Sequence, residues 1–402
     1  MGLGAHETGI DDDFERLRVA TVERLDLLDT PAEERFDRIT RIARELFDVP
    51  VAEINLIDDE RQFTKSPHLP GKATSIARID SFCEVTVQQP DIVVVPDATE
   101  DERFAHRSPV TDERHVRFYA GRPLSLGDDF RVGTLCLVDT IPREFGADQR
   151  RLLDEMGQWV ERELQDTADL DRAAEVQQGL LPQDQPSWPD YDVAGICLPA
   201  KTVGGDFYAW HGDGTGGVAS SVIELTLADV MGKGAAGAIM AAAVRAAFQS
   251  RTGLDVVGAV EAVNAQLADD LGGIGSFATL FHATIDTASG RVDYADAGHG
   301  LSAIVRHDGT VERLEATGLP IGIVAPGEWT RGSVALEPGD RLVTFTDGVL
   351  DLFDGTLASL DEVAAIVRAA PSPHDAVARF AELTAASRAS DDVTVVVVAR
   401  RP

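Results

Sequence analysis

Residues 148–181 contain no proline and divide the sequence into two parts. Apolar residues recur through this stretch at helical spacing with charged residues between them, which predicts one long amphipathic helix that ends before Pro182. The pattern is imperfect at Thr167 and Ala168, where the helix can break. Two interpretations stay open: a linker helix between domains, or a coiled coil that joins two copies of the chain.

Both flanking parts mix helical and strand-like patterns. Before the long helix, helical periodicity begins at Asp13, and strand-like runs follow at residues 51–58, 91–98, 116–124 and 132–139. After it, strand-like runs occupy residues 191–200, 220–230, 277–286, 291–298, 302–309, 340–347 and 392–399. Helical stretches lie between them at residues 234–250, 254–271, 357–370 and 373–387. We therefore expect two α+β domains.

The net charge excludes one broad class of function. The chain has 68 acidic and 36 basic residues, a formal net charge of −32. Such a surface repels nucleic-acid phosphates and anionic membranes, so we expect neither as a partner. The N-terminus lacks a signal-peptide pattern, and no apolar run approaches the roughly 18–20 residues that span a bilayer. We expect a cytoplasmic protein.

The three cysteines, Cys83, Cys136 and Cys197, are scattered through the sequence. They form neither a disulfide framework nor a metal-ligand spacing. Each lies in an apolar stretch, which favours small buried side chains. A redox or covalent-ligand role for Cys83 is the alternative.

Four acidic motifs lie at or near the ends of predicted strands: GGDFY at 204–208, ADVMGKG at 228–234, TDGV at 346–349 and DDVT at 391–394. Taken singly, each aspartate has the simpler interpretation of a turn or a solvated strand edge. As a set without neighbouring histidine or cysteine, they suit hard divalent cations such as magnesium or manganese, and not zinc. Two such ions can polarise a phosphoryl oxygen and activate water.

Residues 173–400 resemble the PPM family of metal-dependent serine/threonine protein phosphatases, in its bacterial SpoIIE-type branch. The resemblance rests on the four motifs in order, and on QGLLP (178–182), FATLFHATID (277–286), DAGH (296–299) and TGLPIGI (317–323). It implies an α-β-β-α sandwich that binds two divalent cations, manganese or magnesium. It also implies a phosphorylated protein substrate, an anti-sigma-factor antagonist of the STAS fold.

The resemblance assigns roles to individual residues. Asp229 matches the aspartate that bridges both metals, and the Val230 carbonyl matches a backbone ligand. Asp347 and Asp391 match direct carboxylate ligands, while Asp206 holds a metal directly or through water. Asp392 would support these ligands from behind, and Lys201 is a tentative partner of the substrate phosphate, with a solvated lysine as its simpler interpretation.

The general acid stays unassigned at this level. No histidine is placed beside Asp229, so Lys233 or a water would protonate the leaving serine oxygen. His299 is better interpreted as a structural histidine at a strand turn. Ala228, Met231 and Gly300 depart from the family pattern, and Asp351 is displaced by one position from a usual glutamate, but no metal ligand is lost.

Residues 13–165 resemble GAF domains, the small-molecule-sensing modules of signalling proteins. The matching stretches are SFCEVTV (81–87), residues 93–110, VRFYAGRPLSL (116–126) and residues 132–156. Glu84 follows Cys83 where bilin attachment has histidine, which disfavours a covalent chromophore. The aromatic residues Phe82, Phe104, Phe118 and Tyr119 either line a ligand pocket or pack in the core.

The predicted organisation is a flexible tail (1–12), a GAF-like sensory domain with an antiparallel sheet (13–147), a linker helix (148–183) and a SpoIIE-type phosphatase domain (184–402). The predicted function is hydrolysis of phosphoserine or phosphothreonine on a partner protein, regulated by the sensory domain, with a homodimer through the linker helix as an option. The alternatives are a non-catalytic scaffold with a phosphatase fold and, less favoured, a phosphoesterase acting on nucleotides.

Overall fold

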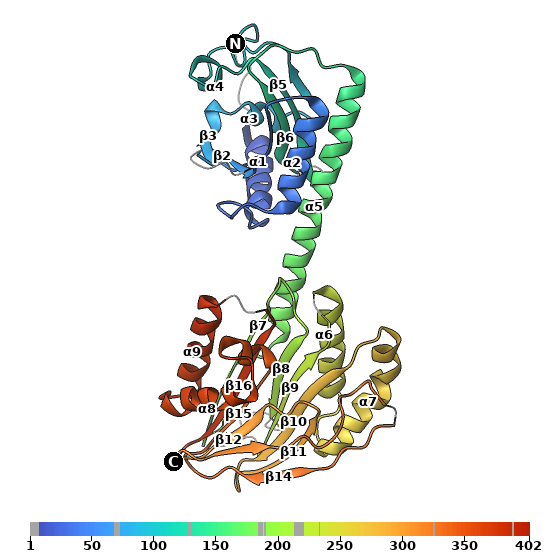
Figure 1. The fold of residues 1–402 in the computed structure, drawn as a ribbon, viewed down its shortest axis with the longest axis vertical. Helices are drawn as coiled ribbons and strands as arrows, with labels where there is room; N and C mark the ends of the chain where they lie inside the picture. The colour runs from blue at the N-terminus through green and yellow to red at the C-terminus, as the bar shows by residue number, and fades with distance from the viewer. Residues whose placement is uncertain are drawn as a thin grey trace. The chain divides into compact units, whose positions relative to one another are not determined.

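The computed structural model describes residues 8–67, 73–127, 130–183, 188, 190–212, 221–232, 234–324, 326–387 and 390–402. The chain divides into two compact units, residues 1–169 and 170–402, each of which has its own sheets and core (Figure 1). Across the described ranges, none of the helices combines the length and the apolar character of a membrane span.

The first unit is built on one antiparallel sheet of six strands in the order β3-β2-β1-β6-β5-β4. Its strands are β1 (Val51–Ile57), β2 (Arg61–Ser66), β3 (Ser75–Ala77), β4 (Val93–Val95), β5 (Phe118–Leu126) and β6 (Phe130–Asp139). Its helices are α1 (Thr8–Glu23), α2 (Glu34–Phe47), η1 (Arg78–Asp80), α3 (Phe82–Val87), α4 (Ser108–Thr111) and the start of α5 (Ala147–Leu180). This is the antiparallel sheet with helices that the GAF resemblance implies.

Side chains of the sheet alternate between two separate cores, because successive residues of a strand point to opposite faces. Phe118 on β5 and Leu137 on β6 pack with α1, α2 and α5. Tyr119 and Cys136, one residue along on each strand, pack with α3 on the other face. The alternation separates the four aromatic residues that were candidates for a ligand pocket. Phe118 lies on the face covered by α1, α2 and α5, whereas Phe82, Phe104 and Tyr119 lie on the α3 side.

Two helices differ from the sequence-based expectation. Helix α1 begins at Thr8, so residues 8–12, expected in a flexible tail, are helical. Residues 1–7 lie outside the described part of the chain. Helix α5 is uninterrupted through Thr167 and Ala168, whose imperfect pattern therefore does not break it.

The second unit contains two five-stranded sheets, with orders β14-β11-β10-β9-β8 and β13-β12-β15-β16-β7. The first has β8 (Asp206–Gly212), β9 (Val222–Val230), β10 (Ala278–Asp286), β11 (Arg291–Ala297) and β14 (Gly332–Ala335). The second has β7 (Tyr191–Leu198), β12 (Ser302–Val305), β13 (Val311–Leu314), β15 (Arg341–Phe345) and β16 (Val393–Arg400). Neighbouring strands in both sheets pair antiparallel.

Helices cover the outer faces of both sheets. The pair α6 (Ala235–Gln249) and α7 (Val256–Gly273) packs on the first sheet, and the pair α8 (Leu360–Ala369) and α9 (Pro373–Ala386) packs on the second (Figure 1). Short η2 (Asp347–Leu352) and η3 (Leu357–Ser359) join β15 to α8. The result is the α-β-β-α sandwich that the PPM resemblance implies.

The interior strand β16, which lies between β15 and β7, shows why this sandwich forms from this sequence. Its run of valines is buried on both faces: Val396 and Val398 pack toward the other sheet, whereas Val395 and Val397 pack against α8 and α9. A strand covered on both faces needs such a continuous apolar run. The helices begin at defined residues, since Asp255 caps α7 with its side chain and Ser372 caps α9.

His282 is a buried titratable group in this sandwich. It lies on β10 and is 4% exposed, with its Nδ1 2.9 Å from the Thr226 hydroxyl. Its ring lies 4.9 Å from the Phe248 ring of α6. Burial lowers the pKa of His282 to about 4. Between about pH 6.5, the ordinary pKa of histidine, and about pH 4, His282 is therefore protonated in the unfolded chain but neutral in the folded chain.

We expect the second unit to lose stability as the pH falls from about 6.5 to about 4, by up to ~1.4 kcal/mol per pH unit for His282. Substitution His282→Gln removes this contribution and should reduce the slope. Hydrogen exchange of the β9 and β10 amides in the full chain, measured across this pH range, reports it. His211→Gln, an exposed residue of β8, is the matched control. A slope that His282→Gln leaves unchanged would contradict the assignment.

Candidate functional site

Asp206 and Asp229 face each other on neighbouring strands. β8 begins at Asp206, and β9 ends one residue after Asp229. The antiparallel register pairs the two residues directly. Directly opposed residues in such a pair have Cβ atoms about 4.5–5.5 Å apart. The first sheet thus brings together two of the four aspartates predicted from the sequence.

The Asp206 carboxylate is joined to the second sheet by two hydroxyl groups. It is 2% exposed, and its Oδ2 accepts hydrogen bonds of 2.7 Å from Thr346 and from Thr394. Thr346 directly follows β15, and Thr394 lies on β16. These bonds place the start of β8 beside the two loops that carry Asp347 and Asp391.

The surroundings of Asp206 disfavour the ionised form of its carboxyl group. Burial raises the pKa of this carboxyl group well above its usual value, and the charge of Asp229 raises it further. The hydroxyl bonds from Thr346 and Thr394 oppose the shift without reversing it. An added cation would favour the ionised form of both carboxylates, since opposite charges within a few ångströms stabilise each other.

A close backbone approach holds the Val230 carbonyl beside Asp206. A Cβ at Gly205 would lie 2.3 Å from the Val230 oxygen, so only glycine fits there. The Val230 N–H donates to the Gly205 carbonyl at 3.2 Å. The turn before Asp206 and the turn after Asp229 therefore form one unit, which contains the carbonyl that was predicted as a backbone ligand.

A second close approach joins the loops of Asp347 and Asp391. A Cβ at Gly348 would lie 2.1 Å from the Asp392 carbonyl oxygen. The Ser390 hydroxyl donates to the Asp351 carboxylate at 2.6 Å, which ties the same loops together. Asp347 is exposed and Asp391 is half-buried, so both lie at an open edge of the sandwich.

Asp392 connects these loops with the start of the second unit's sheets. Its carboxylate accepts hydrogen bonds from the backbone N–H groups of Ala200 at 2.8 Å and Gly205 at 2.7 Å. This arrangement fits the supporting role predicted for Asp392. Lys201, the tentative phosphate partner, directly follows Ala200 and is exposed.

The donor set suits hard cations. Asp206 and Asp229 lie at the ends of β8 and β9, and Asp347 and Asp391 lie beside the ends of β15 and β16, where the contacts above join the chain segments. The four residues offer carboxylate oxygens together with the Val230 carbonyl. Within the described residues, however, no three His, Cys, Asp or Glu side chains are already grouped so as to hold a metal ion. The convergence of the loops is a finding, whereas the set of metal ligands stays a prediction.

His299 lies in a structural turn. It is 8% exposed, its Nε2 is 3.3 Å from the Thr344 hydroxyl, and burial lowers its pKa to about 4. The Asp296 carboxylate accepts from the backbone N–H groups of His299 at 2.7 Å and Gly300 at 2.9 Å. This agrees with the structural role expected for His299. Lys233, the other candidate for a proton donor, lies outside the described residues.

Three residues of the site were missed in the sequence. Thr346 and Thr394 belong to the quoted motifs TDGV and DDVT, but nothing in the motifs themselves indicates that both hydroxyls bind one carboxylate. Gln177, near the end of α5, bonds both backbone groups of Gly204: its Nε2 donates to the carbonyl at 2.7 Å, and its Oε1 accepts from the N–H at 3.1 Å. Gln177 directly precedes the QGLLP stretch, and this position was the one sign in the sequence that it could belong to the site.

The first unit contains a cavity of about 290 Å³ on the α3 side of its sheet. Phe82 and Tyr119 line it, as one of the two interpretations of the aromatic residues expects. Phe104 stacks on Phe82 with ring centroids 4.3 Å apart, and Phe118 lies in the core on the opposite face. Two of the four aromatic candidates therefore line the cavity and two pack in cores.

Comparison with known proteins identifies both units. Residues 31–164 match the family model "GAF domain", and residues 220–401 match "Stage II sporulation protein E (SpoIIE)". Phosphoserine phosphatase RsbU of Bacillus subtilis (strain 168) is 30% identical over 187 residues, which cover 46% of this chain and 54% of that protein. Cyclic di-GMP phosphodiesterase PA2567 of Pseudomonas aeruginosa is 38% identical over 130 residues, 32% of this chain and 22% of that protein.

One solved structure, that of the RsbU and RsbW domains of Rv1364c from Mycobacterium tuberculosis, is 28% identical with a TM-score of 0.47, and covers 54% of this chain and 63% of that one. This chain spans about half or less of the length of the two curated relatives named above. The two family models follow each other along the chain, and the second includes Asp229, Asp347 and Asp391. The chain therefore contains a GAF domain at residues 31–164, followed by a SpoIIE-type phosphatase domain of the PPM family at residues 220–401.

Proposed function

We propose that this protein hydrolyses phosphoserine or phosphothreonine on a partner protein, with two divalent cations, manganese or magnesium, in the site around Asp206 and Asp229. The observation that carries the proposal is the direct pairing of these two carboxylates, with Asp206 bonded to the threonines that flank the Asp347 and Asp391 loops. Similarity to a relative named phosphoserine phosphatase supports the reaction class.

Each residue of the site has a role in this proposal. Asp229 would contact both cations, and the Val230 carbonyl, Asp347 and Asp391 would complete their ligands. Asp206 would bind directly or through water, held in place by Thr346 and Thr394. Bound there, the cations would polarise the phosphoryl oxygens and lower the pKa of water. Lys201, which is exposed beside the site, would pair with the substrate phosphate.

The openness of the site favours a protein substrate. Asp347 and Lys201 are exposed at the edge of the sandwich, where a phosphorylated side chain of a folded partner can reach them. The SpoIIE-type branch indicates a phosphorylated anti-sigma-factor antagonist of the STAS fold as this partner. The deciding experiment is manganese-dependent release of phosphate from such a phosphoprotein and from a generic phosphoester. Binding of the phosphoprotein without release of phosphate at millimolar manganese would instead indicate a non-catalytic scaffold.

Substitution of a predicted ligand tests the assignment most directly. We expect Asp229→Asn and Asp347→Asn each to lower manganese-dependent turnover by at least about 100-fold, because a neutral amide offsets less metal charge. The fold should survive, since removing one carboxylate relieves repulsion in the metal-free site. Asp308→Asn, in a surface turn, is the matched control. Near-normal rates in either ligand variant would contradict the assignment.

Thr394→Val tests whether the hydroxyl bond to Asp206 positions the site. Valine keeps the shape of threonine on β16 but cannot donate the 2.7 Å bond. We expect the manganese concentration that gives half-maximal activity to rise roughly 10-fold or more, with little loss of stability. Thr284→Val is the control, with the same substitution at a position of β10 that pairs with Glu224, five residues along β9 from Asp229. An unchanged manganese dependence would show that the bond has no functional role.

Regulation by the GAF domain can reach the site through α5. This one helix begins at Ala147 in the first unit, and its Gln177 bonds both backbone groups of Gly204. Gly204 precedes Gly205 and Asp206, so a rotation or shift of α5 at Gln177 would move the turn that positions the Asp206 carboxylate. A helix with two discrete arrangements is a suitable element for such control.

Gln177→Leu should uncouple α5 from the Gly204 turn. Leucine keeps the apolar part of the side chain and removes both hydrogen bonds, so we expect lower turnover together with a weaker apparent affinity for manganese. Gln178→Leu, at the next and more exposed position of the helix, is the matched control. Wild-type turnover and manganese dependence in Gln177→Leu would exclude this contact as a route of regulation.

A further inference from the structure

The cavity of the GAF domain holds two cysteines that nothing in the phosphatase proposal uses. Cys83 on α3 and Cys136 on β6 both line it, and both side chains are at most 2% exposed. Exposed residues such as Pro50 and Arg114 also line the cavity, so it reaches the protein surface. A small molecule can therefore reach two thiols that the surrounding core otherwise covers.

One amide group lies between the two sulfur atoms. The Asn55 Nδ2 is 3.2 Å from the Cys136 Sγ and 3.5 Å from the Cys83 Sγ. The Tyr119 hydroxyl is 3.6 Å from the Cys83 Sγ and 2.7 Å from the Thr86 hydroxyl. Two donors thus approach Cys83, and both sulfurs lie within hydrogen-bonding distance of the same nitrogen.

Gly121 makes the approach of Tyr119 possible. A Cβ at Gly121 would lie 2.0 Å from the Tyr119 hydroxyl oxygen, so the tyrosine ring lies along β5 over a residue without a side chain. The register places Gly121 directly opposite Cys136. The strand pair therefore directs the tyrosine hydroxyl to the place where the two thiols are.

An unsatisfied polar atom in the same cavity points to a small polar ligand. Asn55 is fully buried and lines the cavity, yet its Oδ1 has no hydrogen-bond partner among the described residues. A buried acceptor without a partner costs about 1–3 kcal/mol. A ligand with an O–H group would satisfy it while lying next to both sulfurs.

We propose that Cys83 and Cys136 form a redox-active dithiol that reacts with hydrogen peroxide, or a small organic hydroperoxide, in the GAF cavity and closes to a disulfide. The peroxide O–H is a donor for the Asn55 Oδ1. This site senses an oxidant, and its chemistry is independent of the phosphatase reaction proposed above.

The reaction balances in two steps. The Cys83 sulfur attacks one peroxide oxygen, the O–O bond breaks, and the leaving hydroxide takes the Cys83 proton to give water and a sulfenic acid. The Cys136 sulfur then attacks the Cys83 sulfur, the S–O bond breaks, and the second hydroxide takes the Cys136 proton. The two thiols lose two electrons in total, and hydrogen peroxide is reduced to two waters. An organic hydroperoxide would release an alkoxide in the first step, which takes the Cys83 proton and leaves as an alcohol.

The surroundings favour Cys83 as the attacking thiol. Burial raises its pKa, but hydrogen bonds that include those from Cys136 and Tyr119 outweigh burial, and the net direction is downward. The hydrogen bond with Cys83 and burial raise the pKa of Cys136. A thiol with more thiolate character reacts faster with peroxide, and its protonated neighbour is then placed to resolve the sulfenic acid.

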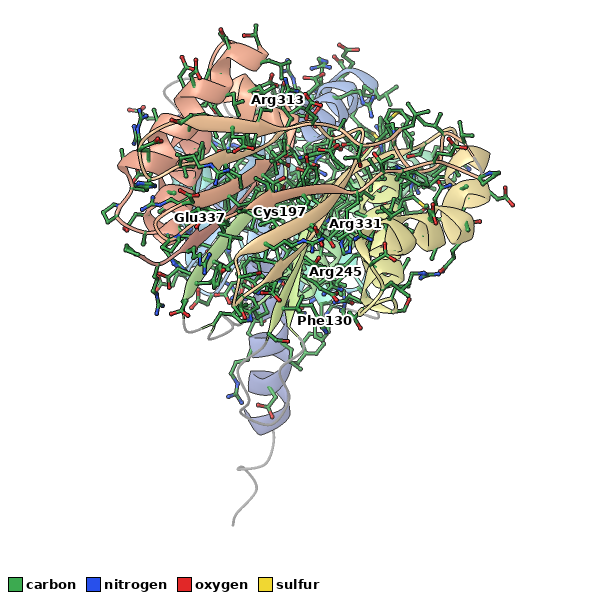
Figure 2. All side chains as sticks on the ribbon, turned by 90° about the horizontal axis from the view of Figure 1, so that it is seen from below. Phe130, Cys197, Arg245, Arg313, Arg331 and Glu337 are labelled. Atoms are coloured by element: carbon green, nitrogen blue, oxygen red, sulfur yellow. The ribbon has the colours of Figure 1, made fainter. Side chains whose placement is uncertain are left out.

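Cys197 is a comparison thiol within the same chain. It lies on β7 in the second unit, buried among the side chains of that unit (Figure 2). Its Sγ is 3.5 Å from the Asp206 carbonyl oxygen, and burial raises its pKa to about 12. The chain has three cysteines, so any peroxide-dependent loss of thiols divides between this residue and the proposed pair.

The test treats the reduced full-length protein with hydrogen peroxide and follows its mass and its free thiols. We expect a decrease of about 2 Da per chain, loss of the Cys83 and Cys136 thiols, and retention of Cys197. After digestion with trypsin, a disulfide should join peptides 79–103 and 132–143. Reduction with dithiothreitol should restore both thiols. Absence of this cross-link, or oxidation of Cys197 at the same rate as the pair, would overturn the proposal.

Two variants separate the steps. Cys136→Ser should stop at a Cys83 sulfenic acid, which dimedone labels, whereas Cys83→Ser should leave Cys136 unlabelled at the same peroxide concentration. Tyr119→Phe keeps the ring and removes the hydroxyl, and should slow oxidation of Cys83 several-fold without changing the product. Equal labelling of Cys136 in Cys83→Ser would overturn the assignment of the attacking thiol. The cross-link in the unmodified chain tests the dithiol even if a variant fails to fold.

Discussion

The hydrogen bonds from Thr346 and Thr394 to Asp206 join the two sheets of the phosphatase domain at the edge where the candidate site lies. Both bonds end on one buried carboxyl oxygen, so a polar group joins the sheets at this edge. Asp229 opposes the same carboxyl group on the neighbouring strand, and burial together with the charge of Asp229 raises the pKa of Asp206. The fold therefore holds two acidic groups together in a position that favours a cation.

Backbone contacts fix the remaining loops around this pair. Gly205 lies against the Val230 carbonyl, and Gly348 lies against the Asp392 carbonyl, at distances that no side chain would permit. Asp392 then bonds Gly205 and Ala200, so the four loops form a closed set of contacts. Such a set positions side chains more accurately than independent surface loops do, which is the condition for a preorganised site. The glycines in the motifs are thus part of the site, although they carry no chemistry themselves.

The sequence predicted the parts of this structure that depend on local pattern. The valine-rich β16 and the apolar run of β9 predict buried strands, and Asp229 near the end of β9 and Asp347 after β15 predict a site at that edge. Strand β8 was missed, because Asp206–Gly212 mixes polar, aromatic and small residues. The bonds of Thr394 and Gln177, and the approach of Cys83 to Cys136, were also missed. They join residues far apart in the chain, so their geometry depends on tertiary packing and leaves no periodic signal.

The two hydrogen bonds of Gln177 join the Gly204 turn to α5, the long helix that begins in the GAF domain. A single side chain bonds both the N–H and the carbonyl of Gly204, so the two bonds form or break together when the helix turns. The same helix packs Leu153 and Val160 into the core of the GAF domain. A change in that core would alter the free energy of a rotated or shifted arrangement of α5 relative to this one. Because the Gly204 turn leads directly into Asp206, even a shift of about one ångström at Gln177 would alter the position of a carboxylate in the candidate metal site.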